Sequence, residues 1–325
     1  MSRLETSIRT QVNNLLTLSE QKGPPINLRL LLPHRHVIRA YPANLGQKKA
    51  QLVPVEGGFV IRYRNMGGSV NRFSIAHEIG HTYYYNLETS PPSKLGVPAI
   101  GIADEERFCD LFAAELLMPA QFVSNEALTA CSQPPYCPST EALIKIAKKF
   151  NVSTRVAARR LIRDLAIWDA IALCCQWLNR PTSRDVKSRD NWAWRGIWGY
   201  KPERYGKNLY LPPFRNLPRI HLDALNDTYE KYFRKGTPST KQYKEPISNL
   251  KLGNLDTFLR HQGYTKEYTV SVSWINLDRD SWDSYIDDHF FSSGDSTDMK
   301  GSCRILVIIP LGSYPVTSSQ NLIQS

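Results

Sequence analysis

The pentapeptide His77-Glu78-Ile79-Gly80-His81 has the residue types and the spacing of a zinc-dependent hydrolase. Residues four apart lie on one face of a helix, so the imidazoles of His77 and His81 can bind a single Zn2+. Zinc lowers the pKa of a bound water to about 7. The Glu78 carboxylate is then expected to act as general base, taking a proton from that water as it attacks a carbonyl. The motif therefore predicts a catalytic metal site.

The residues around this motif indicate a buried helix. Ile75 and Ile79 lie four apart, as apolar residues do on the inner face of a helix. Asn71 or Ser74 is expected to cap its start. The alternative is a chance match on a helix whose histidines are ordinary hydrogen-bonded core residues, a risk that every short motif carries. The apolar spacing favours the metal site.

A third metal ligand is expected from the segment 104–118, which is rich in Ala, Leu and Glu and is followed by Pro119. Such a composition favours a helix, and a catalytic zinc site has three protein ligands and one open position. We expect Glu106 to bind the metal. Asp110, one turn later, is expected to accept a hydrogen bond from the other ring nitrogen of a ligand histidine.

Other side chains of this segment compete with Glu106. Cys109 is an alternative thiolate ligand, but it lies about 100° further round the helix from Asp110. Glu105 or Glu115 is expected to lie on a solvated helix face. Zn2+ is the expected ion, and Mn2+ could also occupy a site of two His and one Glu.

Residues 72–81 and 106–119 together resemble the ImmA/IrrE family of metallopeptidases, in which a helix reading approximately E-x-x-A-N-x-F-A-A-x-L-L-M-P follows the HExxH helix. Cys109 and Asp110 stand where that family usually has Ala and Asn. Asp110 shifts the pattern toward a thermolysin-like ExxxD arrangement. The resemblance covers roughly residues 1 to 165. It implies a zinc endopeptidase that cleaves a helix-turn-helix transcriptional repressor and so derepresses mobile-element or stress-response genes.

The expected fold class is α+β, with a zincin-like peptidase domain first. An amphipathic helix is expected over 4–21, and strands over 37–41, 51–55 and 59–63. Because zinc peptidases commonly hold an extended substrate along a sheet edge, Phe59–Arg64 is the expected cleft edge. Residues 86–103 are expected to form a loop near that cleft. Three domains follow from the patterning: 1–130, the metallopeptidase; 139–180, a basic helix-turn-helix-like helical segment; and 181–325, an α+β module.

The C-terminal module shows strand patterns at 268–274 and 304–310 and a helix pattern at 223–233. Some ImmA/IrrE relatives carry a GAF-like sensor there, so that resemblance implies a ligand-regulated module. Trp192, Trp194 and Trp198 are expected to pack in a core, with an aromatic binding face as the alternative. Adjacent Cys174 and Cys175 are interpreted as small apolar residues of a helix.

A net charge of +11 suggests an anionic partner. Much of the excess lies in a predicted helix, a turn at Asn151-Val152 and a second helix capped by Ser153. This outline is typical of DNA-binding proteins, although the helix pair could instead pack on the peptidase domain or attract an acidic protein. The candidate nucleic-acid contacts are Lys148, Lys149, Arg155, Arg159 and Arg160.

The remaining composition favours a cytoplasmic enzyme without a membrane span. Six Cys in 325 residues do not form a secreted disulfide framework. The N-terminus lacks the apolar run of a signal peptide, and no apolar stretch approaches about 18 residues. The expected partner is a protein substrate, with DNA as an open alternative. The oligomeric state does not follow from the sequence.

Zinc itself is expected to stabilise most of the oxyanion formed during peptide hydrolysis. Among Tyr83, Tyr84 and Tyr85, which follow the motif, Tyr84 is the candidate for an additional hydrogen bond to that oxyanion. The competing function is a non-catalytic regulator that binds DNA or protein and retains the metal site as a structural element.

Overall fold

A computed structural model describes residues 3–96, 101, 104–130, 138–178, 193–202, 240–246, 267–276 and 303–311. The fold is α+β, as the sequence predicts. The chain divides into two compact units, the first containing Met1–Glu126 and Ile144–Arg160 and the second containing Ala127–Leu143 and Leu161–Arg279. All residues of the HExxH motif lie in the first unit.

A three-stranded sheet forms one layer of the first unit. Its strands are β1 (Val37–Pro42), β2 (Ala50–Val55) and β3 (Gly58–Tyr63), in the order β1-β3-β2. β3 runs parallel to β1 and antiparallel to β2. Each predicted strand is confirmed to within a residue at either end. Phe59 and Ile61 of β3 are fully buried, so the central strand supplies the core.

The prediction that Phe59–Arg64 forms the cleft edge is wrong. β3 is hydrogen-bonded on both sides, to β1 and to β2, and therefore has no free edge. Among the described residues, β2 has a strand neighbour on one side only, which makes it an edge strand of this sheet. An apolar strand pattern identifies a buried strand but does not give its place in the sheet.

The turn between β2 and β3 requires glycine. Gly57 and Gly58 have φ of 80° and 150°, which side-chain-bearing residues rarely adopt. A Cβ on Gly58 would also overlap the carbonyl oxygen of His36. That oxygen accepts a hydrogen bond from the Phe59 amide at 2.8 Å, so the turn also fixes the start of β3.

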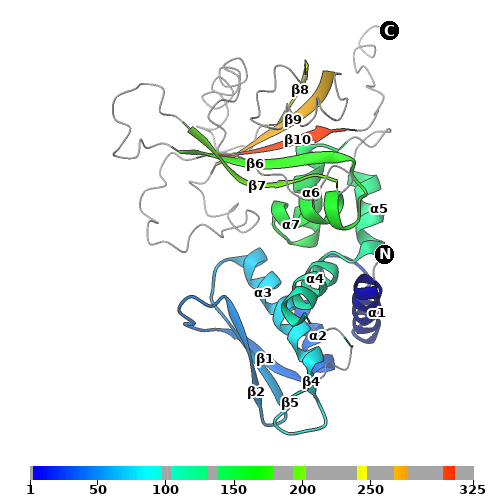
Figure 1. Ribbon diagram of the computed structural model, residues 1–325, viewed down its shortest axis with the longest axis vertical. Coiled ribbons are helices and arrows are strands. Elements are labelled where there is room, and N and C mark those ends of the chain that lie inside the picture. The colour runs from blue at the N-terminus through cyan, green and yellow to red at the C-terminus, as the bar shows by residue number, and fades with distance from the viewer. Residues whose placement is uncertain are drawn as a thin grey trace. The chain divides into compact units, whose positions relative to one another are not determined.

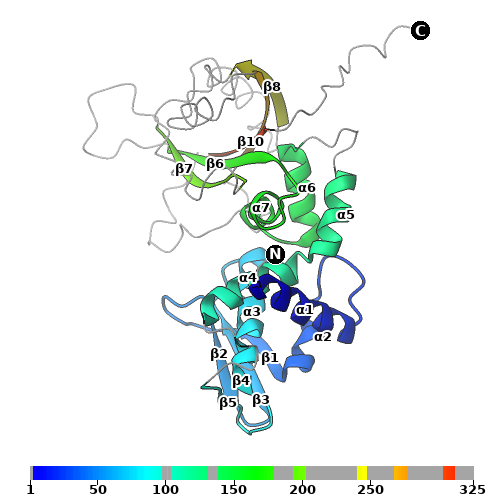
Figure 2. The ribbon, with the colours of Figure 1, turned by 45° about the vertical axis from the view of Figure 1, so that its right-hand side comes forward.

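Three helices build the layers that cover this sheet. α3 (Gly68–His81) packs on β2 and β3, α4 (Glu105–Leu117) packs on α3, and α1 (Arg3–Leu18) packs on α4 (Figures 1 and 2). The apolar stripe predicted for α1 is confirmed, since Ile8 and Val12 are buried. α1 ends where Glu20 takes a left-handed conformation (φ 54°), three residues before Gly23.

A side chain caps the start of α4 but not the start of α3. Asp104 caps α4 by accepting a hydrogen bond from the Arg107 amide at 3.1 Å. α3 begins at Gly68 without a side-chain cap, so neither Asn71 nor Ser74 caps it. Asn71 lies one turn inside the helix and accepts a hydrogen bond from the Met66 amide at 2.9 Å. The apolar spacing identified this helix, but not its first turn.

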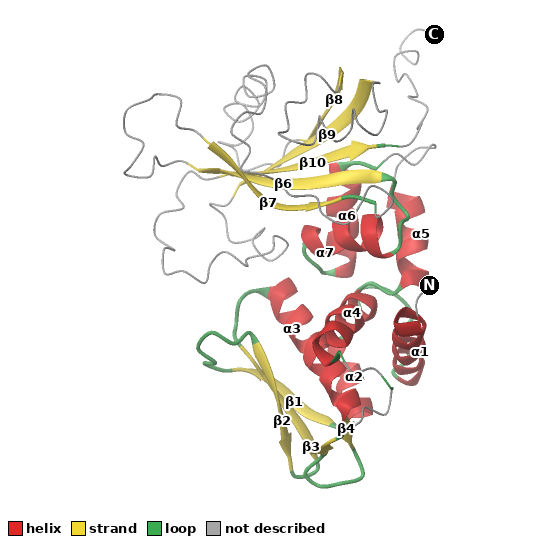
Figure 3. Cartoon of the chain, viewed as in Figure 1, coloured by secondary structure: helices red, strands yellow, loops and turns green. Residues whose placement is uncertain are grey.

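Shorter elements complete the first half of the chain (Figure 3). Where a loop was expected after α3, β4 pairs with β5 in a short hairpin. The helix-turn-helix outline is confirmed: Asn151 is left-handed (φ 53°) and Ser153 accepts a hydrogen bond from Val156. The bounds are α2 (Leu28–Leu31), η1 (Leu32–Arg35), η2 (Thr82–Tyr84), β4 (Tyr85–Asn86), β5 (Ser93–Lys94), α5 (Ala120–Ala130), α6 (Thr140–Phe150), α7 (Thr154–Arg159) and η3 (Arg160–Asp164).

The second unit contains a five-stranded antiparallel sheet in the order β7-β6-β10-β9-β8. Its strands are β6 (Ala170–Leu178), β7 (Ala193–Tyr200), β8 (Thr240–Pro246), β9 (Glu267–Asn276) and β10 (Cys303–Pro310). The strands predicted near 268–274 and 304–310 are confirmed.

The helical interpretation of Cys174 and Cys175 is wrong, because both lie in β6. Ala170–Cys174 of β6 are all buried, so side chains on both faces of the strand are covered, and such a strand reads as a continuous apolar run rather than an alternating one. The helix predicted at 223–233 and the side chains of Trp192, Trp194 and Trp198 lie outside the described residues. The predicted three-domain division and the GAF-like character stay predictions.

Candidate metal centre

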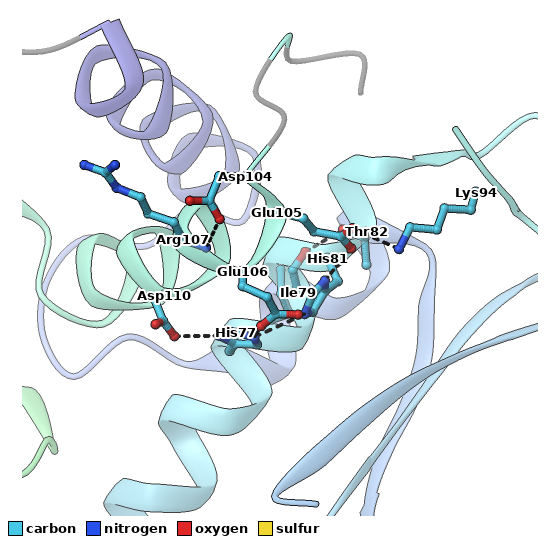
Figure 4. A network of polar contacts seen from close by, with 10 residues as sticks. All are labelled: His77, Ile79, His81, Thr82, Lys94, Asp104, Glu105, Glu106, Arg107 and Asp110. Atoms are coloured by element: carbon cyan, nitrogen blue, oxygen red, sulfur yellow. Dashed lines mark hydrogen bonds and ion pairs between the residues drawn. The ribbon is translucent and has the colours of Figure 1, made fainter. Parts of the chain in front are cut away.

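The last turn of α3 brings His77 and His81 together. Their Nε2 atoms lie 3.1 Å apart (Figure 4). The two side chains are 16% and 14% exposed, so the site is shielded but reachable from solvent. Helical spacing alone accounts for this placement, as the HExxH pattern predicts.

A carboxylate of α4 contacts the Nδ1 atom of each imidazole, on the side of the ring away from the other histidine's Nε2 atom. His77 Nδ1 lies 3.0 Å from Asp110 Oδ1, and His81 Nδ1 lies 2.6 Å from Glu105 Oε1. An ionised carboxylate can only accept hydrogen bonds, so each Nδ1 donates and each neutral ring presents the lone pair of its Nε2 atom. Carboxylates of this kind fix the tautomer and the orientation of metal-binding histidines.

Glu106 completes the group of converging acceptors. Its carboxylate oxygens lie 3.3 Å from His77 Nε2 and 3.6 Å from His81 Nε2. Two imidazole lone pairs and a carboxylate would repel one another at these distances unless a metal cation, or a proton on one of the rings, lies between them. Two imidazole nitrogens and one carboxylate are a ligand set that suits zinc and leaves a position open. The residues therefore fit the metal that the motif predicts.

Cys109 is the other candidate for the third ligand. One ligand atom from each of His77, His81 and Cys109 lies within 4.8 Å of the others. Cys109 is fully buried and packs closely against Gly80. Burial, together with the nearby acidic groups, raises the pKa of its thiol and so opposes the thiolate that a metal needs. This comparison favours Glu106, whose side chain is 76% exposed and approaches both Nε2 atoms.

Substitution separates these two candidates. We expect Glu106→Gln to weaken Zn2+ binding by more than about 100-fold, because losing a ligand costs more than losing an outer partner. Cys109→Ala is expected to leave the affinity within a few-fold. X-ray absorption at the zinc edge checks the ligands directly, since a sulfur ligand lies at about 2.3 Å and nitrogen or oxygen ligands at about 2.0–2.2 Å. A sulfur shell that disappears in Cys109→Ala would assign the ligand to Cys109 instead.

The general-base candidate Glu78 follows His77 on α3 and is 7% exposed. Burial raises the pKa of its carboxyl group, while His81, His77 and a hydrogen bond from the Leu52 amide lower it in part. Leu52 belongs to the edge strand β2. The sheet edge therefore contacts the carboxylate that is expected to accept a proton, which places β2, rather than β3, beside the candidate centre.

The titrations of His77 and Asp110 are linked. Burial alone would lower the pKa of His77, but the hydrogen bond and the charge of Asp110 raise it above the ordinary value. The same hydrogen bond lowers the pKa of Asp110. Both shifts favour a carboxylate that accepts the ring N–H, which is the role expected of Asp110.

Tyr84, the oxyanion candidate, is 2% exposed and packs edge-on against Phe108. Its hydroxyl has no hydrogen-bond partner among the described residues. Burial, and then the nearby Cys109 and Glu105, raise the pKa of this hydroxyl. A group so deeply buried would have to move to reach a substrate, and its role stays a prediction.

The expectation that Glu105 or Glu115 lies on a solvated face is wrong for both residues. Glu105 holds His81, and its other oxygen lies 2.9 Å from Lys94 Nζ. Glu115 is 4% exposed and pairs with Arg160. An acid inside the apolar run 113–117 is a signal that could have revealed the burial of Glu115, whereas nothing local to the sequence pointed to Lys94.

Of the five basic residues suggested as nucleic-acid contacts, the structure buries one. Arg160 is 5% exposed, and its guanidinium donates to Glu115 and to the carbonyl of Met118. It is therefore an internal group rather than a surface contact. Lys149 lies 2.6 Å from Glu126 and is half exposed. Lys148, Lys149, Arg155 and Arg159 stay predictions.

Comparison with known proteins matches the part of the chain that contains this site. A family model described as Peptidase_M78, the IrrE N-terminal-like domain, matches residues 37–162, a span that contains every candidate ligand. No curated protein matches the chain. A solved structure described as a Mycobacterium tuberculosis transcriptional regulator aligns over 95% of this chain and 77% of that chain, with 10% identity and a TM-score of 0.43.

Among the described residues, no helix is both long and apolar enough to cross a membrane.

The match at residues 37–162 spans the three-stranded sheet, the histidine-bearing helix α3, the carboxylate-bearing helix α4 and the later helix pair α6–α7. Residues 37–162 accordingly form an IrrE N-terminal-like domain of the Peptidase_M78 family, which supports the resemblance to ImmA/IrrE metallopeptidases.

Proposed function

We propose that this protein is a zinc-dependent endopeptidase in which His77, His81 and Glu106 bind the metal and Glu78 is the general base. The observation that carries the proposal is the convergence of two Nε2 lone pairs and the Glu106 carboxylate within 3.6 Å. A bound Zn2+ would supply Lewis-acid polarisation and an activated water. Mn2+ is an alternative occupant for the same ligand set.

The chain's own residues provide the rest of the chemistry. Asp110 and Glu105 hold the two imidazoles in the tautomer that presents Nε2. Glu78 is fixed by the Leu52 amide, which keeps its carboxylate beside the site. The edge strand β2 offers backbone groups that can align an extended peptide by strand addition. This arrangement suits peptide-bond hydrolysis with a peptide lying along β2.

The proposed substrate is a helix-turn-helix transcriptional repressor met in the cytoplasm, whose cleavage would derepress mobile-element or stress-response genes. The match of residues 37–162 to the IrrE N-terminal-like domain supports this substrate class. The three-domain organisation, with a C-terminal sensor module, is part of the same proposal, because a sensor would make cleavage conditional on a signal.

The alternative is a non-catalytic regulator that binds DNA or protein. The observation that favours it is the basic helix pair α6–α7, in which Lys145, Lys148 and Lys149 are exposed. Such a surface can contact phosphates or an acidic partner. The two functions differ in what happens to a partner, which is cleaved in one case and only bound in the other.

The zinc-loaded full-length protein, incubated with a panel of purified helix-turn-helix repressors, tests the proposal. We expect discrete fragments of one or a few repressors, loss of cleavage after chelation and recovery on adding Zn2+. Mass spectrometry of the fragments gives the cleaved bond. If every repressor stays intact while the protein binds DNA with a steep salt dependence, the regulator is the correct assignment.

A further inference from the structure

A three-residue chain of contacts connects the β4–β5 hairpin to one of the metal-site histidines. Lys94 Nζ lies 2.9 Å from Glu105 Oε2, and Glu105 Oε1 lies 2.6 Å from His81 Nδ1 (Figure 4). Each oxygen of the Glu105 carboxylate thus has its own partner. Lys94 comes from β5, Glu105 from the first turn of α4 and His81 from the last turn of α3.

We propose that Lys94 is a positioning residue for the metal site, acting through Glu105 to hold the His81 imidazole in its metal-binding orientation. This inference rests on the proposed metal function. It assigns a role to the hairpin that follows the HExxH helix, a segment without a metal ligand or a general base of its own.

The hairpin is attached in a way that lets it act on His81. The Leu95 amide donates to the carbonyl of Tyr84 at 2.9 Å, and Tyr85 pairs with Lys94 across the two strands. The strand that carries Lys94 is therefore fixed to the residues directly after His81. A change in the hairpin would move the Lys94 ammonium relative to Glu105, and so would alter the restraint on the ring.

The carboxylates that contact the two histidines differ in their exposure to solvent. Asp110, which holds His77, is 55% exposed, whereas Glu105 is 21% exposed. A half-buried carboxylate needs a compensating partner, because desolvation destabilises its charge. Lys94 is 58% exposed and supplies that partner. Its ammonium contacts the Glu105 oxygen that does not face His81, which restrains the carboxylate in the orientation that accepts the His81 N–H.

Removal of Lys94 should therefore weaken metal binding without removing a ligand. Substitution of outer partners typically costs 10- to 100-fold in metal affinity. Because Lys94 is one contact further from the ring than Glu105, we expect a loss of about 10-fold for Lys94→Ala. Lys94→Arg keeps the charge and the donors and is expected to bind Zn2+ nearly as well as the wild type.

The test is a double-mutant cycle on the full-length protein, with the Zn2+ dissociation constant measured by competition with a chromophoric chelator. The four proteins are wild type, Lys94→Ala, Glu105→Ala and the double variant. If Lys94 acts through Glu105, its substitution has no further effect once Glu105 is absent. Lys22→Ala, which removes the same charge at an exposed position in the turn after α1, is the matched control.

Three results would overturn the proposal: unchanged affinity in Lys94→Ala, an equal loss in the presence and absence of Glu105, or an equal loss in Lys22→Ala. The last two would indicate a general electrostatic effect. Metal affinity is measured without a substrate, so a wild type that binds Zn2+ but cleaves nothing contradicts the proposed function alone. Normal cleavage and binding in Lys94→Ala contradict this inference alone.

Discussion

Glu78→Gln is expected to lower the rate of peptide cleavage by about a hundred- to ten-thousand-fold, the range that general acid–base catalysis contributes. Gln retains an oxygen that can accept the hydrogen bond from the Leu52 amide, so the side chain should keep its place beneath the site. It has no basic oxygen to take a proton from the attacking water. The measurement is the single-turnover cleavage rate of a repressor substrate with the zinc-loaded variant.

Zinc content and unfolding behaviour are the controls for this variant. Both should match the wild type, because Glu78 is not among the candidate ligands and Gln has nearly the same volume. A rate loss accompanied by loss of zinc would show that Glu78 supports the metal rather than the proton transfer. Cleavage at the wild-type rate with full zinc content would exclude Glu78 as the base.

The sequence predicted those features that depend on local spacing. Two imidazoles one turn apart follow from the spacing of His77 and His81, and the ExxxD spacing puts Glu106 and Asp110 on one helical face. Asp104 and Pro119 bracket α4 as start and stop signals do. The strands β1, β2 and β3 were recognisable from short apolar runs bounded by turn residues.

The sequence does not predict which strands pair, or which side chains far apart in the chain come into contact. β3 is central because β1 pairs with it in parallel, and strand order is not encoded in any single strand. Lys94 and Glu105 meet because a hairpin and a helix end converge at His81. β6 was assigned to a helix because a run buried on both faces has the composition of either element. These features depend on tertiary packing, which local patterns do not record.

Loss of Arg160 is expected to destabilise the junction between α4 and α5. Glu115 accepts hydrogen bonds from Arg160 and from the Ala120 amide, the latter at 2.9 Å, and Arg9 Nε lies 3.7 Å away. Arg160 also donates to the carbonyl of Met118 at 3.1 Å. Arg160→Met would leave the Glu115 carboxylate buried with weaker compensation, and removal of one partner of a buried ion pair costs about 3–5 kcal/mol.

Hydrogen exchange measured by mass spectrometry reports this loss locally, as faster exchange of the amides of α4 and α5. The double variant Glu115→Gln/Arg160→Met should recover part of the protection, because no uncompensated charge remains buried. Arg163→Met, at an exposed position nearby, is the matched control and should change stability by less than about 0.5 kcal/mol.

The same variants decide whether Arg160 takes part in nucleic-acid binding. A surface contact to phosphate would make Arg160→Met lower DNA affinity and its salt dependence while leaving hydrogen exchange unchanged. Burial at 5% exposure and pairing with Glu115 predict the opposite pattern. We therefore expect the exposed lysines of α6 to contact a partner, whereas Arg160, directly after α7, is an internal residue that stabilises the end of α4.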